Sequence, residues 1–293
     1  MIFLGLSILS SSAIYIIFKC LDRFNISTFN VIVINYFIAT LLGLIITDMH
    51  ISNFAVYKHG WFPYSIIIGI LFISMFVIIA KSSQIVGIAI TTISNKMSVI
   101  IPIVVSIIID PKDVLTNLKV AGIIMAISAV FLSVYKKRKK QFDARNIYLP
   151  VILFLGMGLI DSFVKYAQQY HVSDKWLPLF SVTLFAMSAI TGVLVKVIKN
   201  SSFKELLNPQ VLFWGFLLGI SNYGSLYFII KALNYKSNTG NTIDGSVIFG
   251  INNLGIIAFS VFVGYLIFKE RFLKINWVGI ILSFITIYIL SKV

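Results

Sequence analysis

The chain has 293 residues, of which 59% are hydrophobic and 12% are charged, and it carries a formal net charge of +14. With a mean hydropathy of +0.98, it has too little polar surface for a water-soluble globular protein of this length, which excludes the soluble classes. Alternation with a period of two, which a membrane β-barrel would need, is absent. The sequence therefore predicts an all-α integral membrane protein.

A helix needs about 20 apolar residues to cross the hydrocarbon core of a bilayer, which is about 30 Å thick. Runs of suitable length follow one another along the chain, and we expect each to form a transmembrane helix. The first run lacks a basic n-region and a cleavage site of small residues, which favours a permanent helix over a secretory signal. The ten runs cover residues 2–18, 29–48, 62–80, 86–109, 118–135, 147–165, 177–198, 210–231, 243–268 and 275–291.

The fourth run carries Lys96 about eleven residues from its start, near the bilayer centre, where an unpaired cation costs roughly 2.5–3.5 kcal/mol. A lysine ammonium there could bind a carboxylate or phosphate of a solute. The structural alternative is a lysine that pairs with Asp161 or Asp244, or that snorkels to the interface. Polar residues at helical spacing form a stripe beside it. The substrate-binding candidates on this run are Thr91, Thr92, Asn95, Lys96 and Ser98.

A basic linker follows the fifth run, with five consecutive Lys and Arg residues at 136–140. The turns after the odd-numbered runs carry fifteen Lys and Arg residues in total, against eight on the other side of the membrane. The positive-inside rule then predicts a cytoplasmic linker and external termini in a plasma or inner membrane. We expect the linker to determine topology rather than to bind anionic lipid or nucleic acid.

The sixth run contains Asp161, with Lys165 one helical turn later. An i to i+4 ion pair could neutralise both residues without any role in transport. The alternative makes Asp161 a proton-coupling carboxylate within the membrane. Asp244, at the start of the ninth run, is expected to cap that helix rather than to bind substrate.

The eighth and ninth runs carry further polar candidates. Asn222, Ser225 and the aromatic residues Tyr223 and Tyr227 could line a cavity and stack on a substrate ring. In the ninth run, Thr242, Ser246, Phe249 and Asn253 repeat the spacing of the fourth-run stripe. Two related polar stripes are a reasonable lining for a wet cavity, and they make Ser246 and Asn253 binding candidates.

The two halves of the chain repeat each other at an offset of about 150 residues. The matched pairs include Lys19 and Lys165, Gly69 and Gly219, Asp113 and Glu270, and Gly122 and Gly279. The repeat predicts two five-helix units, 1–135 and 147–293, joined by the basic linker 136–146. An odd number of helices per unit inverts the second unit in the membrane, which places a substrate site on a pseudo-two-fold axis near the midplane.

The segments Ser98–Pro102 and Phe268–Phe272, the latter followed by Trp277-Val278-Gly279, carry a family resemblance. Over essentially its whole length, the chain resembles the ten-helix EamA-like members of the drug/metabolite transporter (DMT) superfamily. The resemblance implies two inverted five-helix repeats and a central cavity lined by helices 1, 3, 4, 6, 8 and 9. Transporters of phosphorylated or nucleotide-linked sugars in the wider superfamily are similar in having a substrate-contacting lysine on the fourth helix.

We therefore expect a secondary transporter that exports small polar metabolites, such as amino acids or related anionic or zwitterionic solutes, by alternating access. Alternatives are an organic-phosphate or nucleotide-sugar exchanger, a channel, or a lipophilic-cation pump. His50, His59 and His171 fall in turns, and no HExxH or phosphate-loop motif is present, which argues against an enzyme or an ATP-driven pump. With Cys20 as its single cysteine, the sequence predicts no internal disulfide and no cysteine-based metal site, and we expect no metal or cofactor. The expected partners are a small-molecule substrate and the bilayer but no nucleic acid, for a monomer or a homodimer.

Overall fold

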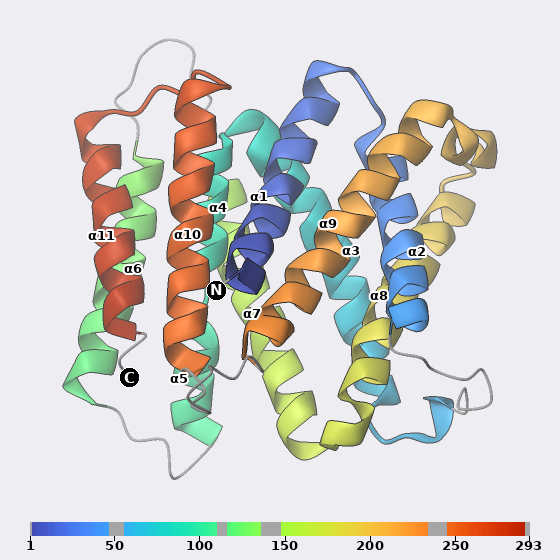
Figure 1. Cartoon of the computed structure of the whole chain (residues 1–293), viewed down its shortest axis with the longest axis horizontal. Coiled ribbons are helices and arrows are strands. Elements are labelled where there is room, and N and C mark those ends of the chain that lie inside the picture. Colours follow the sequence, from blue (N-terminus) through green and yellow to red (C-terminus); the bar gives the residue numbers. More distant parts are fainter. Residues whose placement is uncertain (1, 47–55, 110–115, 136–147, 234–244, 291–293) are drawn as a thin grey trace.

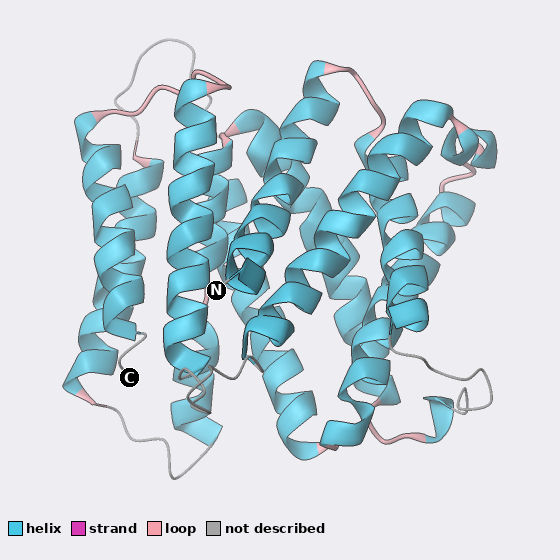
Figure 2. Cartoon of the chain, in the orientation of Figure 1, coloured by secondary structure: helices cyan, strands magenta, loops and turns pink. Residues whose placement is uncertain are grey.

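The computed structural model describes residues 2–46, 56–109, 116–135, 148–233 and 245–290, and every regular element in these ranges is helical (Figure 2). The α-helices are α1 (Ile2–Arg23), α2 (Thr28–Ile46), α3 (Phe62–Ile85), α4 (Ile88–Met97), α5 (Ile100–Ile109), α6 (Asn117–Val134), α7 (Tyr148–Tyr170), α8 (Leu177–Ile198), α9 (Pro209–Leu233), α10 (Gly245–Leu266) and α11 (Lys274–Leu290). Short 3-10 helices lie at η2 (Val56–Lys58), η4 (Asp174–Trp176) and η5 (Phe203–Leu207).

Each predicted apolar run contains helix, but several helices extend past the expected end. Helix α1 continues to Arg23 and α7 continues to Tyr170, about one turn beyond the predicted limits. The reason is that apolarity marks the part of a helix that contacts hydrocarbon, whereas backbone hydrogen bonding continues into the polar interface. The basic linker and Asp113, Thr242 and Asp244 lie outside the described residues.

The fourth run forms two helices instead of one. Helix α4 ends at Met97 and α5 begins at Ile100, with Ser98 and Val99 in a turn between them. Pro102 lacks an N–H and cannot donate to the carbonyl of Ser98. That carbonyl instead accepts from Ile101 at 2.9 Å, and the Ser98 hydroxyl donates to the carbonyl of Asn95 at 2.5 Å. The break therefore leaves Asn95 and Lys96 in the last turn of a short helix.

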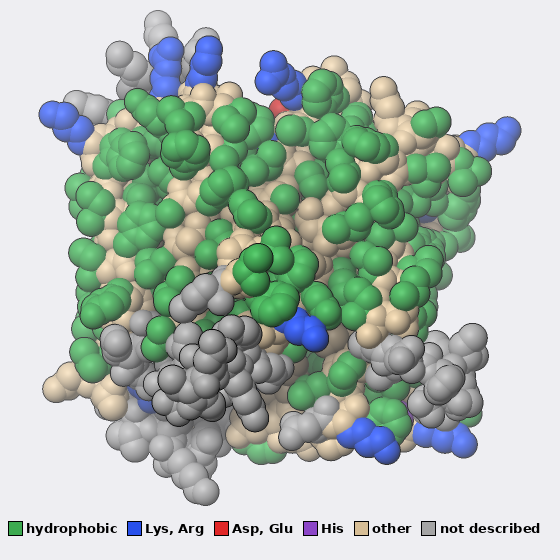
Figure 3. Space-filling view, in the orientation of Figure 1, with side chains coloured by type: hydrophobic (Ala, Val, Ile, Leu, Met, Phe, Trp, Pro, Cys, Tyr) green, Lys and Arg blue, Asp and Glu red, His purple; other side chains and the backbone are tan. Residues whose placement is uncertain are grey.

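The outer surface matches a membrane environment. Eight candidate spans are long and apolar enough to cross a bilayer, with α4 and the first part of α5 taken together, and α6 and α11 are apolar but shorter. Large apolar side chains such as Ile108, Phe131 and Ile198 are mostly exposed. Figure 3 shows hydrophobic side chains across the height of the visible face, with Lys and Arg mostly near its upper and lower edges. The chain thus has the character of a multi-span helical membrane protein.

The helices stand side by side, and successive helices alternate in direction except that α5 continues the course of α4 (Figure 1). The turns after α1, α3, α8 and α10 lie at the upper edge of this view, and the turn between α7 and α8 lies at the lower edge. Helix α1 packs against α9 and α10, whereas α7 packs against α3, α4 and α5. Helices α2 and α8 pack against each other, as do α6 and α11. Helices of the two sequence halves therefore interleave in one bundle instead of forming separate domains.

Close helix contacts recur in reciprocal pairs. A Cβ on Gly43 of α2 would meet Val182 of α8, and a Cβ on Gly192 of α8 would meet Val33 of α2. Glycines 43 and 192 and valines 33 and 182 are both separated by 149 positions. The α2–α8 contact is thus made twice, by equivalent residues with their roles exchanged. Glycine at these positions lets the two helix backbones approach closely.

The glycines matched in the sequence repeat behave in the same way. Gly69 of α3 lies against Met187 of α8, and its equivalent Gly219 of α9 lies against Ile38 of α2. A third reciprocal contact joins α6 and α11, where Gly122 lies against Leu290 and Gly279 lies against the backbone of Ala129 and Ser133. These positions mark where the two halves of the sequence meet in space.

Candidate functional site

A cavity of about 250 Å³ lies among seven helices, α1, α2, α3, α4, α7, α8 and α9. The resemblance implied a lining that includes the ninth run and omits the second and seventh runs. In the structure the ninth run, α10, contributes no described residue to the cavity, whereas the second and seventh runs, α2 and α8, do. Of the predicted binding residues, Asn95, Lys96 and Asn222 lie in the cavity wall. Ser225, predicted as a lining residue, also lies there, and the cavity residues that the sequence did not indicate include Ser11, Tyr15, Tyr36, Phe72, Phe76, Gln168, Ser181 and Phe185.

Asn95 and Lys96 reach the cavity from the last turn of α4. Lys96 is eight residues into this helix, or about 12 Å along its axis, which is nearly half of a bilayer core. The carbonyl end of a helix carries partial negative charge, so the break after Met97 stabilises the ammonium of Lys96. The side-chain amide of Asn95 donates to the hydroxyl of Tyr15 at 2.6 Å, which fixes the neighbouring wall.

Lys96 itself is half-buried and has no hydrogen bond or close ion pair to another residue that the structure describes. The charged group that acts on it through space is Asp161 of α7. Asp161 interacts electrostatically with Lys96, and its side chain is exposed. The ammonium therefore retains its capacity to bind an anionic group.

Helix α9 contributes Asn222 and Ser225 to the cavity wall. The amide nitrogen of Asn222 lies 3.2 Å from the side-chain amide of Asn35 on α2, and Ser225 donates to the carbonyl of Asn222 at 2.8 Å. Tyr223 and Tyr227 stack on each other with ring centroids 6.0 Å apart, away from the cavity wall. Asn222 is thus a candidate contact, whereas the two tyrosines pack within the protein.

The remaining candidates lie apart from the cavity. Thr91 and Thr92 are buried and donate to backbone carbonyls of Gly87 and Ile88, and Thr91 also bonds to Ser82 at 2.7 Å. Asn253 lies on α10, outside the cavity wall, and the side chain of Ser246 lies outside the described set. Helical spacing predicts which residues share a face, but it does not predict which neighbour covers that face.

The two ends of the bundle differ around the cavity. At the upper end, Lys19 Nζ donates to the carbonyl of Gln84 at 2.7 Å, and Gln84 donates to the carbonyl of Phe18 at 3.1 Å and to Thr28 at 3.0 Å. These bonds join α1 and α3, which also pack together. Helices α7 and α9, which the predicted sequence repeat matches to α1 and α3, make at most marginal contact within the described residues. Most cavity residues of α7, α8 and α9 belong to the halves of those helices nearest the lower end.

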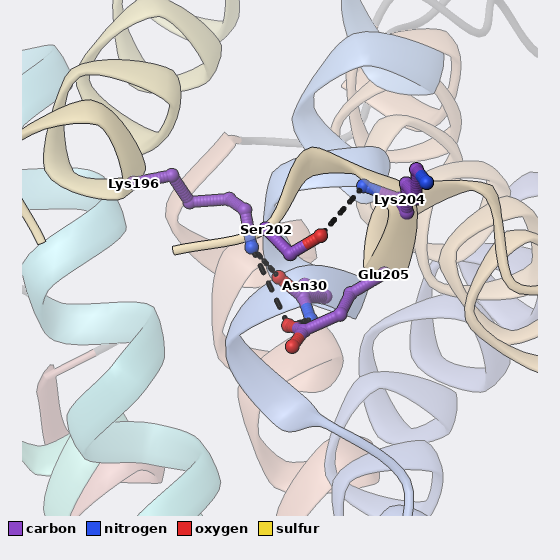
Figure 4. Close-up of polar contacts among 5 residues, drawn as sticks. All are labelled: Asn30, Lys196, Ser202, Lys204 and Glu205. Carbon is purple, nitrogen blue, oxygen red and sulfur yellow. Dashed lines mark hydrogen bonds and ion pairs between the residues drawn. The ribbon is translucent and has the colours of Figure 1, made fainter. Parts of the chain in front are cut away.

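A second polar cluster lies at the upper end, outside the cavity (Figure 4). The ammonium of Lys196, only 2% exposed, donates to Asn30 Oδ1 at 2.7 Å and lies 3.6 Å from Glu205 Oε2. Asn30 also donates to that carboxylate at 2.9 Å. This hydrogen bond, followed by the charge of Lys196, lowers the pKa of Glu205 from its usual value. The cluster ties α2, α8 and η5 together, and every polar partner in it is already engaged.

Glu270 provides the other polar link at the upper end. Its carboxylate accepts from the N–H groups of Ile88 at 2.6 Å and Ala89 at 3.3 Å, in the first turn of α4. Gly87 precedes that turn with a φ of 120°, and Gly264 also lies against the carboxylate. The acidic turn that carried the family resemblance thus caps the helix that bears Lys96.

No family model matches the chain. An uncharacterized protein of Haemophilus influenzae is similar to it, with 26% identity over 290 residues that cover 97% of this chain and 95% of that protein. The similarity spans nearly all the helices, so it concerns the whole bundle and not one segment. The name of that relative assigns no activity.

Proposed function

We propose that this chain is a secondary transporter of the drug/metabolite type, and that it moves small solutes bearing an anionic group by alternating access. The observation that carries the proposal is Lys96, a half-buried ammonium that borders a cavity at mid-depth in an apolar bundle. Ionisable residues within membranes are costly and are typically retained for function. Amino acids and related zwitterions or anions are the proposed substrates, and export is the proposed direction.

The proposed architecture is ten spans in two inverted five-helix repeats. The reciprocal contacts Gly43–Val182 and Gly192–Val33 support it, because a two-fold axis in the membrane plane exchanges equivalent residues in this way. The pairs built on Gly69 and Gly219 and on Gly122 and Gly279 follow the same rule. On this basis α6 and α11 are the two remaining crossings, packed against each other.

The difference between the two ends of the cavity supports alternating access. Inverted repeats can adopt two related arrangements, each with one end closed. The α1–α3 contact, with Lys19 bound to Gln84, is the closed end in this arrangement. In the other arrangement, Lys165 and the C-terminal end of α9 would form the corresponding contact. A channel would need a path through both ends, so the closed upper end favours a carrier.

The proposed orientation in the membrane rests on sequence alone. The basic linker is placed in the cytoplasm and the termini outside, in a plasma or inner membrane. Asp161 is proposed as a proton site, since its exposed carboxylate interacts with Lys96 and could exchange its charge with that of a bound substrate. An enzymatic role is not proposed.

The test is counterflow of labelled solutes into proteoliposomes, with amino acids, carboxylates and organic phosphates as the panel. We expect saturable exchange with at least one anionic or zwitterionic class, and its loss in Lys96→Ala. Gel filtration and thermal unfolding check that the variant folds, and Lys96→Arg should restore part of the exchange. Exchange by folded Lys96→Ala at the native rate would contradict the assigned role of Lys96.

A further inference from the structure

The cavity has two chemically different walls. One consists of aromatic rings from three helices, Tyr36 of α2, Phe72 and Phe76 of α3, and Phe185 of α8. Phe72 and Phe185 stack at 6.5 Å with an interplanar angle of 25°, and Tyr36 lies 5.3 Å from Phe76 and 6.3 Å from Phe185. These rings therefore form one continuous aromatic surface, to which helices from both halves of the chain contribute.

The other wall is polar and carries positive charge. It contains Asn95 and Lys96 from α4, Ser11 from α1 and Asn222 from α9. Within the described lining, Lys96 is the one charged side chain, and Asp161 is not part of the lining. A ligand that satisfies both walls has a single anionic group at one end and an apolar body at the other.

The volume of the cavity limits the size of the ligand. A cavity of roughly 150 Å³ accommodates a benzene molecule, and drug-sized ligands occupy pockets of about 300–1,000 Å³. The observed 250 Å³ therefore fits one ring with a short acidic arm but is too small for a nucleotide-linked sugar. A sugar phosphate would also leave hydroxyl groups against the aromatic wall without hydrogen-bond partners, which is unfavourable.

We propose that the cavity binds monocarboxylates with an apolar body of about one ring, and that an α-amino group on the ligand is dispensable. This inference rests on the proposed function and specifies its substrate class. The carboxylate binds Lys96, the neighbouring amide and hydroxyl groups of Asn95, Asn222 and Ser11 complete its hydrogen bonds, and the ring lies against Phe72, Phe76 and Phe185. Small amino acids such as alanine fill the polar end only and bind more weakly.

The experiment measures binding and counterflow of labelled 3-phenylpropanoate by the purified full-length protein. Phenylalanine, alanine and glucose 6-phosphate serve as competitors. We expect 3-phenylpropanoate and phenylalanine to compete with similar affinity, and alanine and glucose 6-phosphate to compete at least tenfold less well. A tenfold ratio corresponds to about 1.4 kcal/mol, the size expected from contacts between aromatic rings.

Variants separate the two walls. Phe185→Ala should weaken 3-phenylpropanoate binding by roughly tenfold, and Phe185→Leu, which keeps more apolar volume, by less. Lys96→Ala should abolish binding. Phe216→Ala removes a ring that is 49% exposed on the outer surface of α9 and is the matched control, with no expected change.

The outcomes distinguish a failure of the proposed substrate class from a failure of the proposed transporter function. Exchange of alanine or glucose 6-phosphate without any binding of 3-phenylpropanoate would overturn the substrate class and leave the transporter proposal intact. Binding of phenylalanine but not of 3-phenylpropanoate would show that the amino group is required, which also overturns the inference. No exchange of any panel member, with folded protein, would count against the transporter proposal itself.

Discussion

Glu205 belongs to the polar cluster that joins α2, α8 and η5, and it is the exposed member, with 59% of its side chain accessible. Its partner Lys196 is buried and also bound to Asn30. Because the carboxylate is screened by solvent, the strength of this pair is modest, and its clearest signature is its dependence on pH.

Glu205→Gln should reduce thermal stability at neutral pH and have little effect in acid. Its folded-state pKa is lowered from about 4.5, so the charged form is favoured by folding. Such a contribution is fully present above the unfolded pKa and is lost as the pH falls through the folded pKa. Thermal unfolding in detergent across this range should give curves for native protein and variant that converge in acid. A pH-independent difference would mean that the carboxylate charge has no part in it.

Glu270 is a second residue whose role is local. It accepts two backbone hydrogen bonds at the N-terminal end of α4, where the helix dipole favours negative charge. Glu270→Ala should lower the free energy of unfolding by roughly 0.5–2 kcal/mol, the range for loss of a helix cap. Chemical or thermal unfolding checks this value. Lys269→Ala, an exposed neighbour, is the control and should behave like the native protein.

At the scale of elements, the break in the fourth run decides where the candidate site lies. One continuous helix would leave Lys96 in the middle of a regular segment, but Pro102 ends the hydrogen-bonding ladder at Ser98. The resulting helix end offers the ammonium of Lys96 a partial negative charge. The proline is visible in the sequence, whereas the position of the break relative to the cavity depends on how α4 packs against α7 and α10.

The contact between α1 and α3 yields a prediction about conformational equilibrium. Lys19→Met removes the hydrogen bond to Gln84 but keeps the length of the side chain, so it should shift the population toward opening at the upper end. Spin labels placed near the ends of α1 and α3 in a Cys20→Ser background should report a larger fraction of long distances. The same distances measured in Lys58→Met, at the opposite end of the bundle, should not change.

For the molecule as a whole, the uneven distribution of Lys and Arg between the two ends of the bundle predicts which loops are cytoplasmic. We expect Lys58 of η2 to lie outside the cell and Lys204 of η5 to lie inside. In a Cys20→Ser background, a membrane-impermeant maleimide should label Lys58→Cys in intact cells and Lys204→Cys only after permeabilisation. The reverse pattern would invert the orientation and would place the closed end of the cavity outside.

Much of the helical architecture is readable from the sequence, because helices in a bilayer must satisfy their own backbone hydrogen bonds and face lipid with apolar residues. Those two constraints are local, and they predict each run and the membrane class without knowledge of the neighbours. The candidate site was only partly predictable. Lys96, Asn95 and Asn222 are unusual residues in apolar segments and could be identified. Thr91, which shares the spacing of the polar stripe, and its neighbour Thr92 are instead buried and bond to backbone carbonyls near the start of α4.

The sequence by itself determined the membrane class and the approximate positions of the helices, and it identified Lys96 as a charged residue within an apolar run. Tertiary structure alone decided that α2, α3 and α8 supply aromatic rings to the cavity wall, that α10 contributes no described residue to the cavity, and that α1 and α3 pack together and are hydrogen-bonded at one end. The physical reason is that the hydropathy of a segment indicates only whether that helix is stable in lipid or in water. Which helices meet, and at which end they separate, depends on the close packing of glycines and rings from distant parts of the chain.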